Sequence, residues 1–193
     1  TSTSQESGSA KFHFEVISIP AIILAAGRSS RLLEEGIHVP KALLPIGSET
    51  FLSKAVSNCK KICQPLVVLG DRAERIIPIC TSLSVKYCIN ENYERGQTSS
   101  LKMGIKNLPE KTDAFLIYPV DYPLVKRSSV EMLISTFRKD RRAIVSPTYE
   151  GRGGHPVVVS CALRTEFLEL GDDEPARKVI YRDRKRILEV RVN

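Results

Sequence analysis

The stretch LAAGRSSR, at residues 24–31, joins small residues to arginines in a pattern that suits phosphate binding. Small side chains let a phosphate approach the backbone, and a glycine permits a sharp turn. The start of a following helix would offer free N–H groups and the positive end of its dipole, and arginines add charge-assisted hydrogen bonds. The residues concerned are Leu24, Ala25, Ala26, Gly27, Arg28 and Arg31.

A lone lysine, Lys41, follows in PKALLP at residues 40–45 and would supply a mobile ammonium group. The two stretches match neither the Walker motif GxxxxGK(S/T) nor the dinucleotide motif GxGxxG. A tight turn with surface arginines is the alternative explanation. Because the small-residue turn and the lysine occur together, we predict a site for a nucleoside triphosphate.

Asp121 ends an apolar run in YPVDYPLV, residues 118–125. A carboxylate at the end of a buried strand is well placed to bind Mg²⁺, which typically takes one or two protein carboxylates together with substrate phosphates. An aspartate that caps the turn before Pro123 explains the residue alone equally well. The residues alone leave both explanations of Asp121 open.

The stretch NENYERGQTSSLKMG, residues 90–104, carries an amide, a glycine and hydroxyl groups that could recognise a base edge. Asn90 ends a predicted strand, Gly96 opens a turn, and Ser100 lies in the first turn of a predicted helix. On spacing alone, capping of that helix by Thr98 or Ser99 is the simpler explanation.

Two stretches near the C-terminal end are rich in glycine and acidic residues. GRGGHP, residues 151–156, places three glycines before a predicted strand, which indicates close approach to a ligand. His155 could bind phosphate or a substrate carbonyl, or could only shape the loop. In GDDEPAR, residues 171–177, Asp172 and Asp173 could add a second metal carboxylate or cap the helix that a proline opens.

Strands and helices are predicted to alternate from end to end. The predicted strands are residues 20–26, 66–70, 85–90, 114–121, 143–149, 156–160 and 187–192. The predicted helices are residues 50–63, 71–80 (limited by Pro78), 98–107, 128–140 (capped by Ser128 or Ser129), 162–170 and 174–183. This order implies a Rossmann-like α/β domain with a mostly parallel sheet and helices on both faces. Ligands of such sheets bind outside the carboxyl ends of the strands, where the motifs above fall.

The length of 193 residues suits a single domain, and a hydrophobic fraction of 42% is typical of globular proteins. We predict a flexible tail at residues 1–12 and one domain at residues 13–193. No run approaches the roughly 18 apolar residues of a membrane span, and the N-terminal stretch has no signal-peptide pattern. We therefore expect no membrane partner.

A formal net charge of +7 is explained by solubility alone or by a polyanionic partner. No nucleic-acid-binding motif occurs, so we predict a phosphorylated small molecule and not a nucleic acid. A solvated helix face explains the dense basic stretch at residues 182–186 as well as a ligand does. Five scattered cysteines indicate free thiols in a reducing compartment, the cytoplasm. Cys59 and Cys63 are better explained as small core residues than as zinc ligands.

Taken in order, these motifs resemble the MobA-like NTP transferases, and most closely their molybdenum-cofactor cytidylyltransferase branch. The resemblance covers about residues 20–190. The family's LAAGxSxR is similar to residues 24–31, with its lysine at Lys41. The family motif N-x-x-(W/Y)-x-x-G-x-x-x-S is matched by Asn90, Tyr93, Gly96 and Ser100, and the motif D-x-P by Asp121 and Pro123. The motif GR-x-GHP is matched by Gly151, Arg152, Gly154, His155 and Pro156.

The resemblance implies a three-layer (αβα) domain of the nucleotide-diphospho-sugar transferase (GT-A-like) type. It also implies Mg²⁺-dependent nucleotidyl transfer, of the EC 2.7.7 type, in which an acceptor phosphate attacks the α-phosphorus of an NTP and pyrophosphate leaves. By resemblance the donor is CTP and the acceptor is molybdopterin or its molybdenum-loaded form.

The resemblance further implies a role for each matched residue. Phosphate binding falls to Gly27, Arg28, Arg31 and Lys41, and the base and ribose side to Asn90, Gly96 and Ser100. The acceptor faces Arg152, Gly154 and His155, and the metal is held by Asp121 with Asp172 as a possible second ligand.

Two departures from the family pattern leave alternatives open. The loop between Arg31 and Lys41 is longer than this branch usually has, and PKALLPIG is similar to the opening of sugar-phosphate nucleotidylyltransferases. The family's GDxGAR appears as GDDEPAR, with one extra residue and Pro175 where a glycine is expected. A sugar-phosphate nucleotidylyltransferase and a nucleotide-binding regulator without catalysis are the alternatives. No motif selects the base or indicates an oligomeric state.

Overall fold

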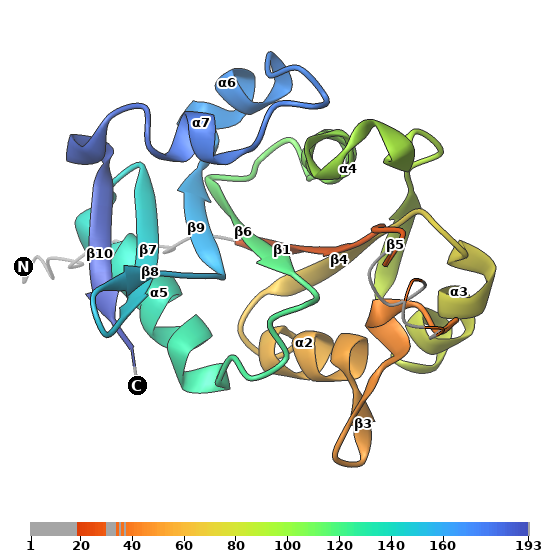
Figure 1. The fold of residues 1–193 in the computed structure, drawn as a ribbon. Helices are drawn as coiled ribbons and strands as arrows, with labels where there is room; N and C mark the ends of the chain where they lie inside the picture. Colours follow the sequence, from red (N-terminus) through yellow and green to blue (C-terminus); the bar gives the residue numbers. More distant parts are fainter. Residues whose placement is uncertain (1–18, 30–33, 35, 37, 193) are drawn as a thin grey trace, which may run out of the picture.

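Within the described residues, eight strands join in one sheet, and helices cover both of its faces (Figure 1). The computed structural model describes residues 19–29, 34, 36 and 38–192. In chain order the strands of this sheet are β1 (Pro20–Ala25), β4 (Gln64–Leu69), β5 (Lys86–Ile89), β6 (Ala114–Pro119), β7 (Ile144–Tyr149), β8 (Arg152–Gly153), β9 (Val157–Ser160) and β10 (Ile187–Arg191). Their order in space is β10-β7-β9-β6-β1-β4-β5, with β8 paired to β7.

The predicted, mostly parallel sheet is confirmed. Parallel pairing joins β5, β4, β1 and β6 in succession, and it joins β7 to β10. Strand β9 runs antiparallel between β6 and β7. The connection from β7 to β9 holds only the short β8 and glycine-rich turns, and a connection without a crossover helix can return only an antiparallel strand.

Alternate residues of β1 face opposite helical layers, as the two-residue period of a strand requires. Ala21, Ile23 and Ala25 belong to one hydrophobic cluster, whereas Ile22 and Leu24 belong to another. The first cluster takes in residues of α2 (Phe51–Cys59), α3 (Ala73–Ser82) and α5 (Arg127–Asp140), and the second takes in residues of α4 (Gln97–Lys106), α6 (Arg164–Leu168) and α7 (Arg177–Ile180). The predicted three-layer αβα domain is therefore confirmed.

The connections hold short elements that the sequence did not predict. A two-stranded hairpin of β2 (Pro45–Ile46) and β3 (Glu49–Thr50) precedes α2, and strands of two residues are too short to give an alternating pattern. The 3₁₀ turns are η1 (Lys41–Leu43), η2 (Tyr93–Arg95), η3 (Cys161–Leu163) and η4 (Arg184–Arg186).

Two predicted helix limits were wrong. Pro78 does not end α3: it is the sixth of the ten residues of this helix, which continues to Ser82 although the proline lacks the N–H for one helical hydrogen bond. Neither Ser128 nor Ser129 caps α5, whose N-cap is Lys126 without a side-chain hydrogen bond. The backbone N–H of Ser129 donates instead to the Lys126 carbonyl, so the helix begins before the serines.

The helix predicted at residues 174–183 is shorter in the structure, where α7 has only four residues. Residues before it form a turn closed by the Gly171 N–H, which donates to Glu174 Oε2 at 2.7 Å. After it, Asp183 caps η4. The basic stretch at residues 182–186 is partly used by the fold, since Arg182 and Arg186 both pair with Glu166 of α6.

The cysteines of the first layer are core residues, as predicted. Cys59, Cys63 and Cys80 are buried in the first cluster, and all five cysteines are free thiols. Burial raises the pKa of Cys80 to about 11, so its thiol is protonated at neutral pH. Among the described helices, none has the length and apolar character needed to cross a membrane.

The packing of α4 on the sheet predicts the effect of a single methyl group. A Cβ at Gly104 would collide with Cγ2 of Ile22 in β1 and lie 3.1 Å from Cγ2 of Val68. Overpacking costs about 1–3 kcal/mol, whereas alanine gains about 1 kcal/mol of helix propensity. We expect Gly104→Ala to lower the free energy of unfolding by about 1 kcal/mol in urea denaturation. In an Ile22→Ala background the same change should be neutral or stabilising, and stabilisation of the unaltered protein would contradict this packing.

Candidate functional site

The loops that follow β1 and β6 lie side by side because these two strands are parallel neighbours. Leu24 lies opposite Pro119 in the register, and the Val120 N–H donates to the Leu24 carbonyl at 3.1 Å. Both strands end at the same edge, so the small-residue loop at Gly27 comes next to Asp121. The sheet thereby joins two motifs that are more than ninety residues apart in the chain.

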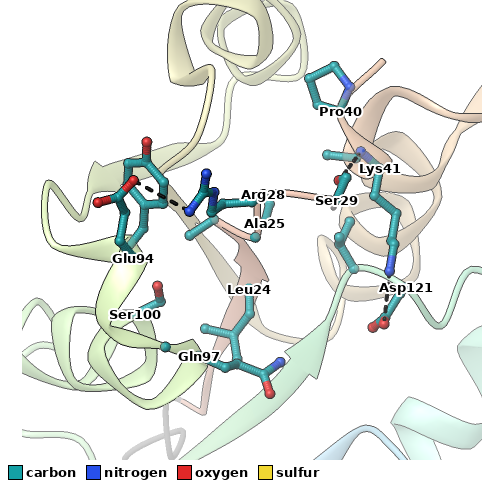
Figure 2. Close-up of a pocket in the computed structure, with 16 residues that line it drawn as sticks. Leu24, Ala25, Arg28, Ser29, Pro40, Lys41, Glu94, Gln97, Ser100 and Asp121 are labelled. Carbon is teal, nitrogen blue, oxygen red and sulfur yellow. Dashed lines mark hydrogen bonds and ion pairs between the residues drawn. The ribbon is translucent and has the colours of Figure 1, made fainter. Parts of the chain in front are cut away.

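A cavity of about 380 Å³ opens at this edge and is called the first cavity (Figure 2). It is lined by Leu24, Ala25, Ala26, Gly27, Arg28, Ser29, Pro40, Lys41, Ala42, Tyr93, Glu94, Gly96, Gln97, Ser100, Val120 and Asp121. Three of the motifs found in the sequence therefore contribute to one concave surface. Among the described residues predicted for the phosphates, base and metal, all line it except Asn90, Asp172 and Asp173.

Lys41 and Asp121 lie next to one another on one side of the first cavity (Figure 2). Lys41 Nζ lies 3.5 Å from Asp121 Oδ2, and the two side chains are 39% and 46% exposed. The backbone N–H of Lys41 donates to Ser29 Oγ at 3.1 Å, which ties η1 to the loop after β1. The backbone of Lys41 is thus fixed, while its ammonium group is free to change partner. No described backbone N–H donates a capping hydrogen bond to the Asp121 carboxylate, whose partner is the Lys41 ammonium group.

Arg28 approaches the first cavity from the opposite side. Its Nη1 lies 3.7 Å from Glu94 Oε1, and both side chains are 64% exposed (Figure 2). An ion pair this exposed is weak, so the guanidinium can turn to an anion. The Arg28 carbonyl accepts from Arg72 Nη2 at 3.2 Å, which holds the loop backbone from α3.

Gly70 lets the loop after β5 approach the loop after β1. A Cβ there would lie 2.6 Å from Tyr93 Cβ and 2.7 Å from the Ala26 carbonyl oxygen. Only a residue without a side chain fits between them. This requirement could not be read from the sequence, where Gly70 stands as one glycine after a strand.

Asn90 lies beneath the first cavity and does not line it. It is 2% exposed, and its Nδ2 donates to Ser99 Oγ at 2.9 Å and to Ser100 Oγ at 3.0 Å. Its Oδ1 accepts the Asn92 N–H at 3.1 Å, which fixes the orientation of the amide. The Ser99 hydroxyl group donates a hydrogen bond to the carbonyls of Asn92 and Gly96. The capping alternative fails, because the N-cap of α4 is Gly96, without a side-chain hydrogen bond.

A second cavity of about 450 Å³ adjoins the first and shares Leu24, Gly96 and Gln97 with it. Gly154, His155 and Asp172 line it, so the two C-terminal motifs meet there. Arg152 lies on β8, is exposed and lines none of the described cavities. Arg31, also predicted for the site, falls outside the described residues.

His155 is held between Asp121 and an aromatic ring. Its ring centroid lies 5.0 Å from that of Tyr122, and its Nδ1 is buried without a hydrogen-bond partner in the described structure. Burial lowers the pKa of His155, and the charge of Asp121 and the backbone of Ile117 oppose that shift in part. The imidazole is therefore neutral at pH 7 and able to accept a hydrogen bond.

Asp172 is already paired with two cations. Its Oδ1 lies 3.0 Å from Lys102 Nζ, and its Oδ2 lies 3.5 Å from Arg95 Nη1. The hydrogen bond from Lys102, more than any other contact, holds the pKa of Asp172 below its usual range. Neither Asp172 nor Asp173 caps α7, whose N-cap is Ala176.

Asp121 has the exposure and position to bind a divalent metal together with a ligand. Among the described residues, no group of three or more His, Cys, Asp or Glu side chains could hold a metal ion. A metal carried by one carboxylate and several phosphate oxygens fits this composition, as is typical of Mg²⁺.

Glu94 and Gln97 also line the first cavity, although neither was predicted as a site residue. Gln97 is exposed, lines both cavities and stands first in α4, and Glu94 faces Arg28. Gln97 directly follows Gly96, so its place at a helix start was the one signal that could have identified it. Glu94 carried no signal, because its role depends on the distant Arg28.

Two curated relatives are similar in sequence over much of this chain. The bifunctional protein GlmU of Syntrophotalea carbinolica is 30% identical over 134 residues, which are 68% of this chain and 28% of that protein. The chain spans about a quarter of the length of the GlmU proteins that it matches. The nicotine blue oxidoreductase of Paenarthrobacter nicotinovorans is 26% identical over 178 residues, which are 86% of this chain and 82% of the relative.

Two solved structures share the fold. That of Rv0371c from Mycobacterium tuberculosis H37Rv has a TM-score of 0.79 at 24% identity and covers 91% of this chain and 88% of that one. The structure of a nucleotidyl transferase from Methanothermobacter thermautotroptrophicus has a TM-score of 0.74 at 23% identity and covers 90% of this chain and 87% of that one. These likenesses establish the nucleotide-diphospho-sugar transferase fold. In addition, the family model of the MobA-like NTP transferase domain matches residues 21–187. Because that match covers most of the chain and every residue that lines the first cavity, the protein belongs to the MobA-like NTP transferase family.

Proposed function

We propose that this protein is a Mg²⁺-dependent nucleotidyltransferase. It transfers CMP from CTP to a phosphorylated small molecule, molybdopterin or its molybdenum-loaded form. One observation carries the proposal: the small-residue loop, Lys41 and Asp121 line a single cavity at the carboxyl edge of the sheet. A backbone cradle, a lysine and a metal-binding carboxylate are the groups that hold and neutralise a triphosphate.

In the proposed reaction an oxygen of the acceptor's phosphate forms a bond to the α-phosphorus of the NTP. The bond between the α-phosphorus and the oxygen that bridges it to the β-phosphate breaks. Pyrophosphate leaves with that oxygen and with the electron pair of the broken bond. The acceptor phosphate is already ionised at neutral pH, so no general base is required. The protein contributes alignment of the two phosphates and stabilisation of the charge that develops.

The donor nucleotide occupies the first cavity in this proposal. Gly27 and Arg28, with Arg31, hold the β- and γ-phosphates, and Lys41 moves from Asp121 to the α-phosphate. The Ser100 oxygen already accepts from Asn90, so its hydroxyl proton is left to donate to the base or ribose. Asn90 therefore orients Ser100 and does not touch the nucleotide itself.

Asp121 is the proposed ligand of Mg²⁺, which when bound would neutralise part of the phosphate charge. The half-exposed carboxylate at the cavity mouth supports this assignment. A structure of Rv0371c in complex with manganese supports divalent-metal binding on the same fold, although at 21% identity.

The acceptor occupies the second cavity in this proposal, with Gly154 and the neutral His155 in its wall. Arg152 is proposed to reach the acceptor from the rim, because β8 is exposed beside this cavity's Gly153. The five free cysteines support a reducing compartment, the cytoplasm.

Two alternatives are favoured by particular observations. A nucleotide-binding regulator without turnover is favoured by the altered GDDEPAR stretch, which here forms a turn and a four-residue helix. A redox function is favoured by the oxidoreductase name of the relative that covers most of this chain. A regulator would bind a nucleotide without releasing pyrophosphate, and an oxidoreductase would need an electron carrier such as NADPH.

Nucleotide binding should be visible as a melting shift. We expect one triphosphate among CTP, GTP, ATP and UTP to stabilise the protein in the presence of Mg²⁺, by about 2.7 kcal/mol at 100 times its dissociation constant. Asp121→Asn should abolish the Mg²⁺-dependent part of this stabilisation. Asp140→Asn, at the far end of α5, should leave it unchanged. A shift with NADPH and with no triphosphate would overturn the transferase proposal in favour of the redox function.

Catalysis should depend on the Lys41 ammonium group. We expect Lys41→Met to lower kcat for pyrophosphate release by about 10²- to 10³-fold, as loss of one charge-stabilising donor does. Melting temperature should change little, because the Lys41 side chain is partly exposed and its one close partner is Asp121. Lys61→Met, an exposed lysine in the turn after α2, serves as the matched control. Unchanged kcat in the Lys41 variant would refute its assigned role.

A further inference from the structure

The turn formed by residues 170–174 is fastened to α4 by one lysine. Lys102 Nζ donates to the Leu170 carbonyl and to Asp172 Oδ1, the latter at 3.0 Å. The Lys102 side chain is only 16% exposed and that of Asp172 30%, so this pair is better shielded than the pairs at the first cavity. Arg95 adds a longer contact to the other oxygen of Asp172, at 3.5 Å.

The same turn contacts the first residues of α4 through its backbone. Thr98 Oγ1 donates to the Glu174 carbonyl. A Cβ at Gly96 would lie 2.8 Å from the Asp172 carbonyl oxygen, so only a glycine allows this approach. The 170–174 turn therefore touches the start of α4 at residues 96, 98 and 102, spaced over about one and a half helical turns.

The start of α4 forms a wall common to both cavities. Gly96 and Gln97 line the first cavity, where the donor is proposed to bind, and also the second, where the acceptor is proposed to bind. Asp172 lines only the second cavity, whereas Asp121 lines the first. Both carboxylate oxygens of Asp172 are occupied by cations, so metal binding there would require the loss of these contacts.

We propose that Lys102 and Asp172 form a clasp that positions the wall between the two substrates, and that Asp172 is a positioning residue and not a second metal ligand. This inference rests on the proposed function for its effect on turnover. The clasp fixes Gly96 and Gln97 at the donor and acceptor together, so its loss weakens binding of both substrates and leaves the metal at Asp121 unaffected.

The metal-ligand hypothesis makes the opposite predictions. If Asp172 held Mg²⁺, its loss would raise the Mg²⁺ concentration needed for half-maximal activity. Loss of Lys102 would then free the carboxylate and lower that concentration. Under this hypothesis the two variants would shift the half-saturating Mg²⁺ concentration in opposite directions. Under the clasp proposal both variants have the same effect.

The test compares Lys102→Met, Asp172→Asn and the double variant with Lys106→Met. Lys106 is an exposed lysine one turn further along the same helix. Pyrophosphate release gives KM for the NTP and the half-saturating Mg²⁺ concentration, and melting with the NTP alone gives its affinity. We expect each single variant to raise KM by about 10-fold, the effect of losing a charged hydrogen bond, and the double variant to be no worse than either. Half-saturating Mg²⁺ should stay within about 2-fold, and Lys106→Met should match the unaltered protein.

Three results would overturn the clasp. The first is that both single variants have the same kinetics as Lys106→Met. The second is a rise in half-saturating Mg²⁺ concentration in Asp172→Asn alone. The third is a KM in the double variant that is raised by the full product of the two single effects. Circular dichroism and melting without ligand show whether a variant has folded. If Lys102→Met does not fold, Asp172→Asn still tests the clasp, because it preserves side-chain volume.

Hydrogen exchange separates failure of the clasp from failure of the proposed function. If the unaltered protein neither binds a triphosphate nor releases pyrophosphate, the transferase proposal fails. The clasp still predicts faster exchange of the amides at residues 97–100 in Lys102→Met than in Lys106→Met, without any ligand. Equal exchange in these two variants would overturn the clasp whatever the protein binds.

Discussion

The parallel pairing of β1 with β6 is the constraint on which the site depends. It sets Leu24 opposite Pro119, so the loop at Gly27 and the carboxylate of Asp121 leave the sheet as neighbours. The buried apolar residues of both strands fix this register, because a slip by one residue would turn Leu24 away from the α4 layer and into the other. The chemistry proposed at the sheet edge is therefore positioned by hydrophobic packing inside the sheet.

Close packing extends the same control to the base side of the first cavity. Gly104 lets α4 lie against Ile22 and Val68, and Gly70 lets the loop of Tyr93 lie against Ala26. Ser100, on α4, is thus set by the core, and Asn90 fixes the direction of its hydroxyl group. Bulkier residues at either glycine would displace the cavity wall, although neither glycine would touch a ligand.

The sequence predicted the layers, most strands and the motifs that meet at the first cavity, because each is encoded locally. An apolar run predicts β1, and a polar residue at its carboxyl end marks the edge where ligands bind. What the sequence could not predict depends on distant partners. Asn90 ends a strand as a ligand-binding residue would, yet β4 and α4 bury it. Asp172 stands in a motif that suggests a metal ligand, and only the fold brings Lys102 to it. The short α7 likewise reflects contacts of the 170–174 turn with α4.

Charge balance explains how a site with cations on both sides can exist without its ligand. Arg28 lies beside Glu94 and Lys41 beside Asp121, so each of these two described cations of the first cavity already has a carboxylate partner. A triphosphate that arrives with a divalent metal offers both signs of charge at once. The proposed binding step is then an exchange of partners, in which Lys41 passes to phosphate as Asp121 passes to the metal. Because both side chains of that pair are partly exposed, the proposed exchange would break only a weak contact, and the carboxylate that pairs with Lys41 is the one proposed to bind the metal.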